Sequence, residues 1–312
     1  MKSTPLTIVK LLQKSKYWLL GLALGLISLH LFLIWKVSFH LDAGSAATRN
    51  VGSELLSLSL LFWGAALSIA WQKRHTLRLE SGVFSSFLGA TIIILVVLKS
   101  LSLSNNDSFL HISPLLSGVG LCLLASGVKG LKQYWKELLL LLVLAIPVEE
   151  TLARLIDLDT LTAQFADFIL VHLGFDAARN GTTVALPTGA VKVDPGCSGL
   201  RAITRLVQLS TLILVMIPTS WIGKVIIPFM AVLVAFTVNS VRVVVLALLI
   251  ANSHRKAFDF WHEGTGSHGI SILSVLILWL LCQFLIQRDE AGNEGVGSSA
   301  KSERRFPPSG TL

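Results

Sequence analysis

Three residues that lie far apart in the sequence, Cys197, Arg242 and His262, have side chains that can perform acyl-transfer chemistry. Cys197 follows a Pro-Gly pair and opens an apolar run, so we expect it at a helix N-terminus, where unpaired backbone amides favour negative charge. Arg201 lies one helical turn further on, and Arg205 one turn beyond that. This setting favours the thiolate, the nucleophilic form of cysteine. Cys197 is therefore the candidate nucleophile, and the alternative is a buried structural cysteine in a turn.

Arg242 and His262 supply the other two groups. Arg242 interrupts an apolar stretch, where a cation is costly and usually functional, and Asn239 lies three residues earlier on the same helical face. A guanidinium offers a fork of donors to an oxyanion or a carboxylate, although an arginine near the interface can also simply extend toward water. His262 lies in a polar loop, and an imidazole is the usual base beside a nucleophilic thiol. His254 and His268 lie near the same loop and compete for that role.

The elements that must position these residues are predicted to be membrane helices. Of the 312 residues, 53% are hydrophobic and only 14% are charged, whereas a soluble domain is about a quarter charged. A bilayer crossing needs roughly 20 apolar residues, and we count eight candidate runs: 17–35, 53–71, 83–101, 109–128, 137–149, 200–217, 224–252 and 268–287. The seventh run is too long for one straight crossing, so it is either two helices or one long tilted helix.

The distribution of Lys and Arg predicts the orientation. With a cytoplasmic N-terminus, fifteen of these residues fall in inside segments and seven in outside segments, and an excess of positive charge marks the cytoplasmic side. For the same reason, the net charge of +8 is not taken as a sign of nucleic-acid binding. This topology places the connections 150–199 and 253–267 outside, so Cys197, Arg242 and His262 all lie toward one leaflet.

The connection before Cys197 has two predicted parts. An apolar stripe over 150–173 indicates an amphipathic helix on the membrane surface, and the stretches 182–187 and 190–193, which flank Thr188-Gly189, indicate a β-hairpin. The predicted fold is an all-α polytopic membrane protein of about eight transmembrane helices, with a small extracytoplasmic β-hairpin before Cys197. We expect one membrane domain over 1–288 and a disordered cytoplasmic tail over 289–312, which is rich in Gly, Ser and charge.

Three stretches resemble the exosortase/archaeosortase family, and in particular its exosortase branch. They are Cys197-Ser198-Gly199-Leu200-Arg201, Asn239-Ser240-Val241-Arg242-Val243 and Trp261-His262-Glu263-Gly264-Thr265-Gly266. Their order and spacing agree with the family's Cys…Arg…His pattern. The resemblance covers roughly residues 80–287, and the stretch 261–268 is similar to cyanobacterial exosortases.

The resemblance implies a membrane cysteine protease or transpeptidase that cleaves C-terminal sorting tails of exported proteins at the outer face of the bacterial inner membrane. Such PEP-CTERM-like tails carry a short Pro-Glu-Pro-like motif, a membrane helix and a basic cluster. The implied roles are nucleophile for Cys197, general acid/base for His262, and stabiliser of the oxyanion or substrate for Arg242. Arg201, Asn239, Ser198 and Gly199 would support them. The expected partners are these tails and the lipid bilayer, without nucleic acid, cofactor or metal.

Two other functions fit parts of the sequence. Residues 149–154 match the Glu-Glu-x-x-x-Arg motif of the glutamate-dependent CAAX-protease-like family, and 258–262 match its Phe-x-x-x-His element. The later His-x-x-x-Asn/Asp element is missing, because Ile272 stands four residues after His268. The other alternative is a non-enzymatic transporter or scaffold membrane protein, in which Arg201, Arg205 and Arg242 would form an anion path and Cys197 would be incidental.

Overall fold

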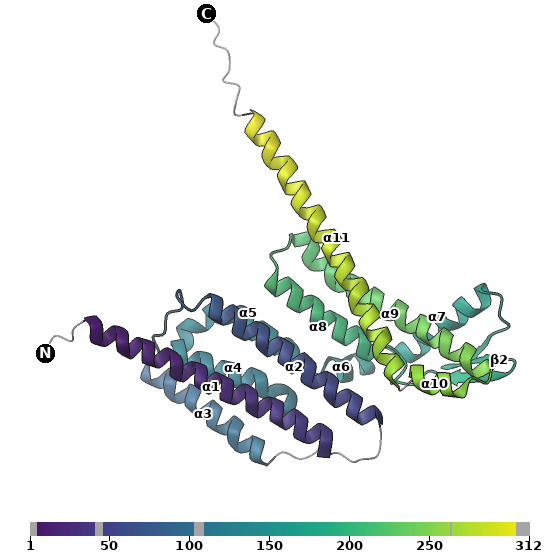
Figure 1. The fold of residues 1–312 in the computed structure, drawn as a ribbon, viewed down its shortest axis with the longest axis horizontal. Helices are drawn as coiled ribbons and strands as arrows, with labels where there is room; N and C mark the ends of the chain where they lie inside the picture. Colours follow the sequence, from purple (N-terminus) through teal and green to yellow (C-terminus); the bar gives the residue numbers. More distant parts are fainter. Residues whose placement is uncertain (1–4, 41–45, 103–108, 263, 304–312) are drawn as a thin grey trace, which may run out of the picture. The chain divides into compact units, whose positions relative to one another are not determined.

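The computed structural model describes residues 5–40, 46–102, 109–262 and 264–303, with the backbone alone at 5–16, 37–40, 46–54, 150, 265 and 288–303. The chain divides into two compact units, Met1–Pro147 and Val148–Leu312 (Figure 1). Helices make up most of both units, and the described strands lie in the second.

The first unit is built from helices. They are α1 (Pro5–His40), α2 (Ala46–Gln72), α3 (Val83–Leu101), α4 (Phe109–Gly130), the 3-10 helix η1 (Leu131–Tyr134) and α5 (Trp135–Ala145). Helix α4 packs against α1, α3 and α5, and α2 packs against α1 and α5. A Cβ atom placed on Gly89 of α3 would lie 2.7 Å from the carbonyl oxygen of Gly120 in α4. The two backbones therefore approach closely, which small residues allow between membrane helices.

Helices α4 and α5 form an antiparallel hairpin. Gly127, with a φ of 67°, breaks α4 near its end, in a conformation that glycine adopts readily. The hydroxyls of Ser126, just before the break, and of Tyr134, after it, lie 2.9 Å apart, and further along the pair Gly118 of α4 lies against Leu141 of α5. The chain therefore reverses direction between α4 and α5.

The turn of this hairpin lies beside the end of α2. Lys73 Nζ donates hydrogen bonds of 3.0 Å to the Gln133 carbonyl oxygen and of 3.0 Å to the buried carboxylate of Glu137. The backbone amide of Arg78 donates to the Gln133 side chain. One end of the first unit thus gathers the chain segments that hold six basic residues: Lys73, Arg74, Arg78, Lys129, Lys132 and Lys136.

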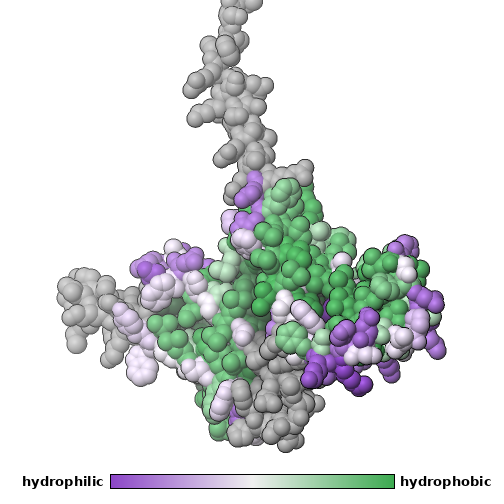
Figure 2. Space-filling model, turned by 45° about the vertical axis from the view of Figure 1, so that its right-hand side comes forward, coloured by the Kyte–Doolittle hydropathy of each residue, from purple (hydrophilic) through white to green (hydrophobic). Residues whose placement is uncertain are grey.

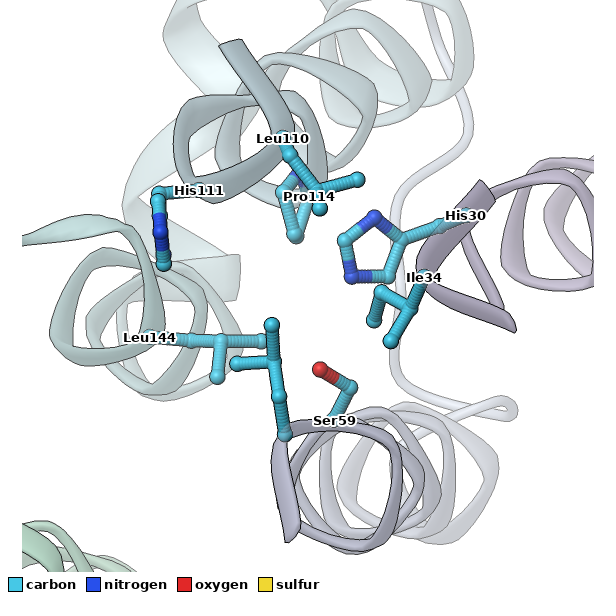
Figure 3. A pocket seen from close by; sticks show the side chains of 8 residues that line it. His30, Ile34, Ser59, Leu110, His111, Pro114 and Leu144 are labelled. Atoms are coloured by element: carbon cyan, nitrogen blue, oxygen red, sulfur yellow. The ribbon is translucent and has the colours of Figure 1, made fainter. Parts of the chain in front are cut away.

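A narrow pocket with both polar and apolar side chains in its walls lies inside the first unit (Figure 3). His30 of α1 is buried, and its Nδ1 lies 3.1 Å from Ser113 Oγ of α4. Within the described part of the chain, His30 Nε2 and Ser59 Oγ have no hydrogen-bond partner. Figure 3 shows both side chains beside a space that His111 and Leu144 also line. The interior of this unit is therefore not purely apolar.

The second unit contains helices and a small sheet. Its elements are α6 (Val148–Leu155), α7 (Leu158–His172), β1 (Ala178–Asn180), β2 (Thr183–Leu186), β3 (Gly189–Lys192), α8 (Leu200–Met216), α9 (Trp221–Ala251), α10 (Arg255–His262) and α11 (Thr265–Glu303). Helix α9 is its centre, because it packs against α7, α8, α10, α11, β2 and β3. It is one continuous helix, so of the two alternatives for 224–252 the single helix is correct.

The sheet is antiparallel, in the order β1-β2-β3, and Val184 pairs with Val191. Alternation along the strands directs Val184, Leu186 and Val191 to one face, which packs on α7 and α9. Strands β2 and β3 occupy the predicted hairpin, but the turn falls at Pro187-Thr188, because Gly189 already pairs with Leu186. Strand β1 was not predicted, since all three of its residues are exposed and show no alternation.

Six stretches of the described residues are long and apolar enough to cross a membrane. They are Tyr17–Lys36, Leu55–Gln72, Val83–Leu101, Phe109–Ala145, Trp221–Ala251 and Gly266–Gln287. The predicted run 109–128 and the greater part of the run 137–149 fall in one of these stretches, Phe109–Ala145, and the run 200–217 corresponds to α8, which has 17 residues. The chain is a multi-pass membrane protein, and the count of eight crossings stays a prediction.

The surface of α11 is typical of a lipid-facing helix. Figure 2 shows hydrophobic residues in a continuous green surface below the grey C-terminal segment. Large apolar side chains of α11, among them Ile272, Trp279 and Phe284, are exposed. Helix α11 continues to Glu303. It therefore includes residues 289–303 of the segment 289–312, whose composition predicts a disordered tail. Residues 304–312 lie outside the described residues, as does Glu263.

The single helix predicted over 150–173 is wrong, because the chain forms α6 and α7 with a break between them. Asp157 starts α7 as its N-cap: its carboxylate accepts a 3.1 Å hydrogen bond from the Thr160 amide and a 2.7 Å bond from the Thr160 hydroxyl. Such a cap satisfies amides that have no partner within the helix. The apolar stripe continues across the break and so did not reveal it.

Candidate active site

Cys197 lies in a tight turn between β3 and α8. Its backbone amide donates to the carbonyl oxygen of Asp194 at 2.9 Å and to Asp194 Oδ1 at 3.0 Å, and the Ser198 amide donates to the same carbonyl at 2.9 Å. Pro195 and Gly196 occupy the two central positions, where a reverse turn favours these residues. The turn thus fixes Cys197 just before the start of α8, and the residue is only 2% exposed.

Two buried side chains hold this turn from neighbouring helices. Asn239 of α9 donates from Nδ2 to the Cys197 carbonyl oxygen at 2.7 Å, and Thr162 of α7 donates from Oγ1 to the Ser198 carbonyl oxygen at 2.8 Å. Gly199 follows with a φ of 85° and packs directly on Asn239. Both carbonyl oxygens thereby accept a hydrogen bond within the protein. A buried carbonyl without a partner would cost free energy of folding.

His262 is the last residue of α10, and its Nε2 lies 2.8 Å from Cys197 Sγ. The Phe258 ring stacks on the imidazole, with ring centroids 5.0 Å apart and planes 18° from parallel. Phe258 is in turn packed against the apolar cluster that contains Cys197. The imidazole is thus held beside the thiol by packing as well as by its helix.

Arg242 of α9 binds the end of α10. Its Nη2 donates to the His262 carbonyl oxygen at 2.6 Å, its Nε lies 3.4 Å from the Trp261 carbonyl oxygen, and its Nη1 lies 3.5 Å from Asn239 Oδ1. The last carbonyls of a helix have no donors within the helix, so a guanidinium is a suitable cap. Arg242 therefore contacts the backbone of His262 and the side chain that holds Cys197.

Three further charged groups, Arg201, Glu149 and Asp159, lie around the turn. Arg201 Nε is 3.9 Å from Glu149 Oε2 of α6, a long contact between two half-exposed side chains. Burial raises the pKa of Asp159, and an interaction with the Ser198 hydroxyl acts in the opposite direction. These groups lie near the Cys197 turn, and none of them forms the contact between Cys197 Sγ and His262 Nε2.

The arrangement can support nucleophilic catalysis. A thiol beside an imidazole can pass its proton to the ring and become a thiolate, and a third group orients the base. In the described residues, no group of three or more His, Cys, Asp or Glu side chains is placed to hold a metal ion.

The structure brings together Cys197, Arg242, His262 and Asn239, which the sequence predicted as one site. Ser198 and Gly199 form the same turn, whereas Arg201 turns to Glu149. Of the glutamate-protease elements, His262 contacts Cys197, and the side chain of Glu150 lies outside the described residues.

Sequence reasoning missed Thr162, Asp194 and Phe258. Thr162 and Asp194 act through backbone groups of the Cys197 turn, and Phe258 acts through its ring on His262. Asp194-Pro195-Gly196 is a turn signal that could have identified Asp194 as the residue that closes the turn. Thr162 had no such signal, because a threonine in a helix is ordinary.

Residues 48–280 match the family model described as transmembrane exosortase. This range is most of the chain and includes Cys197, Arg242 and His262. Neither the curated proteins nor the solved structures gave a match to this chain.

Proposed function

The chain belongs to the transmembrane exosortase family, and on that premise we propose that it is a membrane-embedded cysteine protease or transpeptidase. Its substrates are exported proteins that end in a sorting tail of the PEP-CTERM kind: a short motif, a membrane helix and a basic cluster. Its products are the protein without the tail and the released tail.

The observation that carries this proposal is the 2.8 Å contact between Cys197 Sγ and His262 Nε2. The two residues are 65 positions apart and come from different elements, a turn before α8 and the end of α10. A thiol and an imidazole at this distance are the pair that nucleophilic acyl transfer needs.

The chemistry follows from the pair. Cys197 gives its proton to His262 Nε2, and the thiolate adds to the carbonyl carbon of the scissile peptide bond. When the C–N bond breaks, the leaving amine takes the proton from His262. Water or an amine then attacks the thioester, its proton passes to His262, and the thiol is restored as the new carboxyl or amide product leaves.

The helix arrangement supports eight crossings. The Cys197 turn, at the start of α8, is bonded to Asn239 in the second half of α9, so α8 runs antiparallel to α9 and crosses as α9 does. Similarly, α4 and α5 lie side by side as a hairpin, which makes Phe109–Ala145 two crossings. Counting α8 and α5 as crossings raises the six stretches to eight. The two crossings α8 and α9 then lie between Cys197 and His262, so both residues are on the same side of the bilayer, as their contact requires.

The charges support an orientation with the site outside. The basic end of the first unit, which includes Lys73 and Lys132, is expected in the cytoplasm, and eight crossings then place both termini there as well. In a bacterium, this orientation corresponds to a protein of the inner membrane whose Cys197–His262 site faces the extracytoplasmic side. The basic end of a substrate tail would stay inside by the same rule, which brings the motif to the outer face.

The test is co-expression with a secreted reporter that carries such a tail. The parent chain is compared with Cys197→Ala and with Cys282→Ala, a matched control in which another buried cysteine of the second unit is removed. Reporter mass is read by gel and mass spectrometry. We expect removal of the tail by the parent and by Cys282→Ala, and no removal by Cys197→Ala.

Other outcomes decide between the alternatives. Equal processing by parent and Cys197→Ala would exclude the thiol as nucleophile and favour the glutamate-dependent protease. A chain that never processes a tail, and whose transport or assembly phenotype depends on Arg201 or Arg205 but not on Cys197, would be a transporter or scaffold.

A further inference from the structure

Asn239 and Arg242 connect the backbones of the two reacting residues. Asn239 binds the Cys197 carbonyl oxygen through Nδ2 and faces Arg242 Nη1 through Oδ1, and Arg242 binds the His262 carbonyl oxygen. They lie three residues apart, on one face of α9. We call this pair the α9 bridge. It is a chain of contacts from one reacting residue to the other, anchored on one helix.

The bridge is well suited to fix a distance. Helix α9 packs against every element that carries part of the site, and Asn239 is only 5% exposed. At the other end, Arg242 provides the donors that the final carbonyls of the short helix α10 lack. A shift of α10 away from α9 would also break these bonds.

From these contacts we infer that Arg242 is a positioning residue: through the α9 bridge it sets the separation of Cys197 Sγ and His262 Nε2 and so allows the proton to pass between them. The resemblance implied instead that Arg242 stabilises the oxyanion or the substrate. The inference rests on the proposed Cys–His chemistry but not on the identity of the tail.

Arginine is needed here for its shape as well as its charge. Its planar fork reaches two backbone carbonyls and an amide oxygen at once, whereas lysine presents a single point charge. Arg242→Lys therefore keeps a positive charge near the thiol and removes the bridge. The variant thus distinguishes two roles of Arg242: holding His262 in place through its hydrogen bonds, and attracting the thiolate through its positive charge alone.

Alkylation of Cys197 by iodoacetamide separates positioning from oxyanion binding. The thiolate displaces iodide from a saturated carbon, so an S–C bond forms, iodide leaves, and no oxyanion appears. The reaction needs only an ionised thiol. A residue that acts solely on an oxyanion leaves its pH dependence unchanged, while a residue that positions His262 changes it.

The experiment uses the full chain in a Cys122→Ala/Cys282→Ala background, so that Cys197 is the only thiol. The alkylation rate is followed by mass spectrometry from acidic to alkaline pH for the parent, His262→Ala, Arg242→Lys, Asn239→Ala and the double variant Asn239→Ala/Arg242→Lys. The midpoint of each profile is compared, because Cys197 is 2% exposed and absolute rates also depend on access. Size-exclusion chromatography in detergent checks that each variant is folded.

We expect the parent to react well below the pH at which an ordinary thiol ionises, about 8.5, and His262→Ala to react near that value. Arg242→Lys and Asn239→Ala should each move the midpoint by about one unit or more toward His262→Ala. Since both act through one bridge, the double variant should move it no further than the larger single change. If Arg242→Lys is misfolded, Asn239→Ala still tests the bridge.

Three results would decide otherwise. An unchanged midpoint in Arg242→Lys, together with loss of tail removal, means that Arg242 acts directly on the substrate. Shifts that add in the double variant mean that there is no bridge. A parent midpoint equal to that of His262→Ala overturns both the inference and the cysteine-protease chemistry. If the midpoints are as expected but no tail is removed, the inference is supported and only the proposed substrate is rejected.

Discussion

At the scale of single residues, the Cys197 turn depends on side chains that are not reactive. Thr162 is fully buried and donates to the Ser198 carbonyl oxygen. Thr162→Val keeps the shape and leaves that carbonyl unsatisfied, which should cost about 1–3 kcal/mol of stability. Thr162→Ser is the matched control, because it keeps the hydroxyl. Thermal unfolding in detergent and tail removal should both be impaired in the valine variant and largely kept in the serine variant; equal behaviour would show that the hydrogen bond is unimportant.

Gly199 offers a second prediction of this kind. Its φ is 85°, and a Cβ placed on it would lie 2.7 Å from Asn239 Nδ2. Gly199→Ala should therefore lose tail removal as well as stability, the latter by roughly 1–2 kcal/mol for the left-handed backbone alone. Gly174 is the control, because its φ is 87° and nothing lies within 4 Å of its Cβ position. Gly174→Ala should cost similar backbone strain while tail removal persists; loss of processing in both would point to general destabilisation.

What could be predicted from single residues was which of them lie together. Cys197, Arg242 and His262 were recognisable because a thiol at a helix start, a cation in an apolar run and an imidazole in a loop are each unusual. Thr162 and Phe258 were not recognisable, since their roles depend on which carbonyl or ring lies opposite. The resemblance implies that Arg242 meets the substrate, and its contact with the His262 carbonyl oxygen points to another role.

At the scale of elements, the start of α7 has two carboxyl groups, one on its N-cap residue and one in its first turn, whose pKa values shift in opposite directions. Hydrogen bonds from the Thr160 hydroxyl and amide hold the pKa of Asp157 below its usual range, whereas burial raises the pKa of Asp159. Asp157 therefore stabilises the fold above its unfolded-state pKa, and this contribution is lost as the pH falls through the folded-state value. For Asp159 the effect on stability has the opposite sign. As the pH rises past the unfolded-state pKa, ionisation of this carboxyl lowers the stability of the fold.

The corresponding variants are Asp157→Asn and Asp159→Asn, with melting temperature measured at neutral and acidic pH. At neutral pH we expect Asp157→Asn to be less stable than the parent and Asp159→Asn to be more stable. At a pH below both carboxyl pKa values the differences should shrink, because the parent is then also uncharged at these positions. A neutral-pH loss of stability in Asp159→Asn would mean that the charged form is well accommodated.

Elements were predictable where a pattern repeats. The long apolar helices and the β2–β3 hairpin follow from period and alternation. The break between α6 and α7 depends on one capping carboxylate, Asp157, and β1 is a short exposed strand that exists because β2 offers it an edge. Both depend on local partners and not on periodicity, so the sequence pattern did not indicate them.

At the scale of the whole molecule, the proposed orientation is open to a direct measurement. In a cysteine-free background, Ala190→Cys marks the exposed side of β3 and His75→Cys marks the exposed connection after α2. A membrane-impermeant maleimide should label Ala190→Cys in intact cells and His75→Cys only after the membrane is opened. The reverse pattern would place the site in the cytoplasm, and labelling of both positions from one side would contradict the eight-crossing topology.

The burial of Cys197 has a consequence for survival of the site in the extracytoplasmic location proposed above. A cysteine that ionises easily is also the one most readily converted to sulfenic acid or captured in a mixed disulfide. With 2% of its surface exposed, the thiol is shielded from peroxide and from stray disulfides while no substrate is present. Under the proposed function, a substrate tail must displace the groups that cover Sγ, so the thiol would be most open to oxidation during turnover.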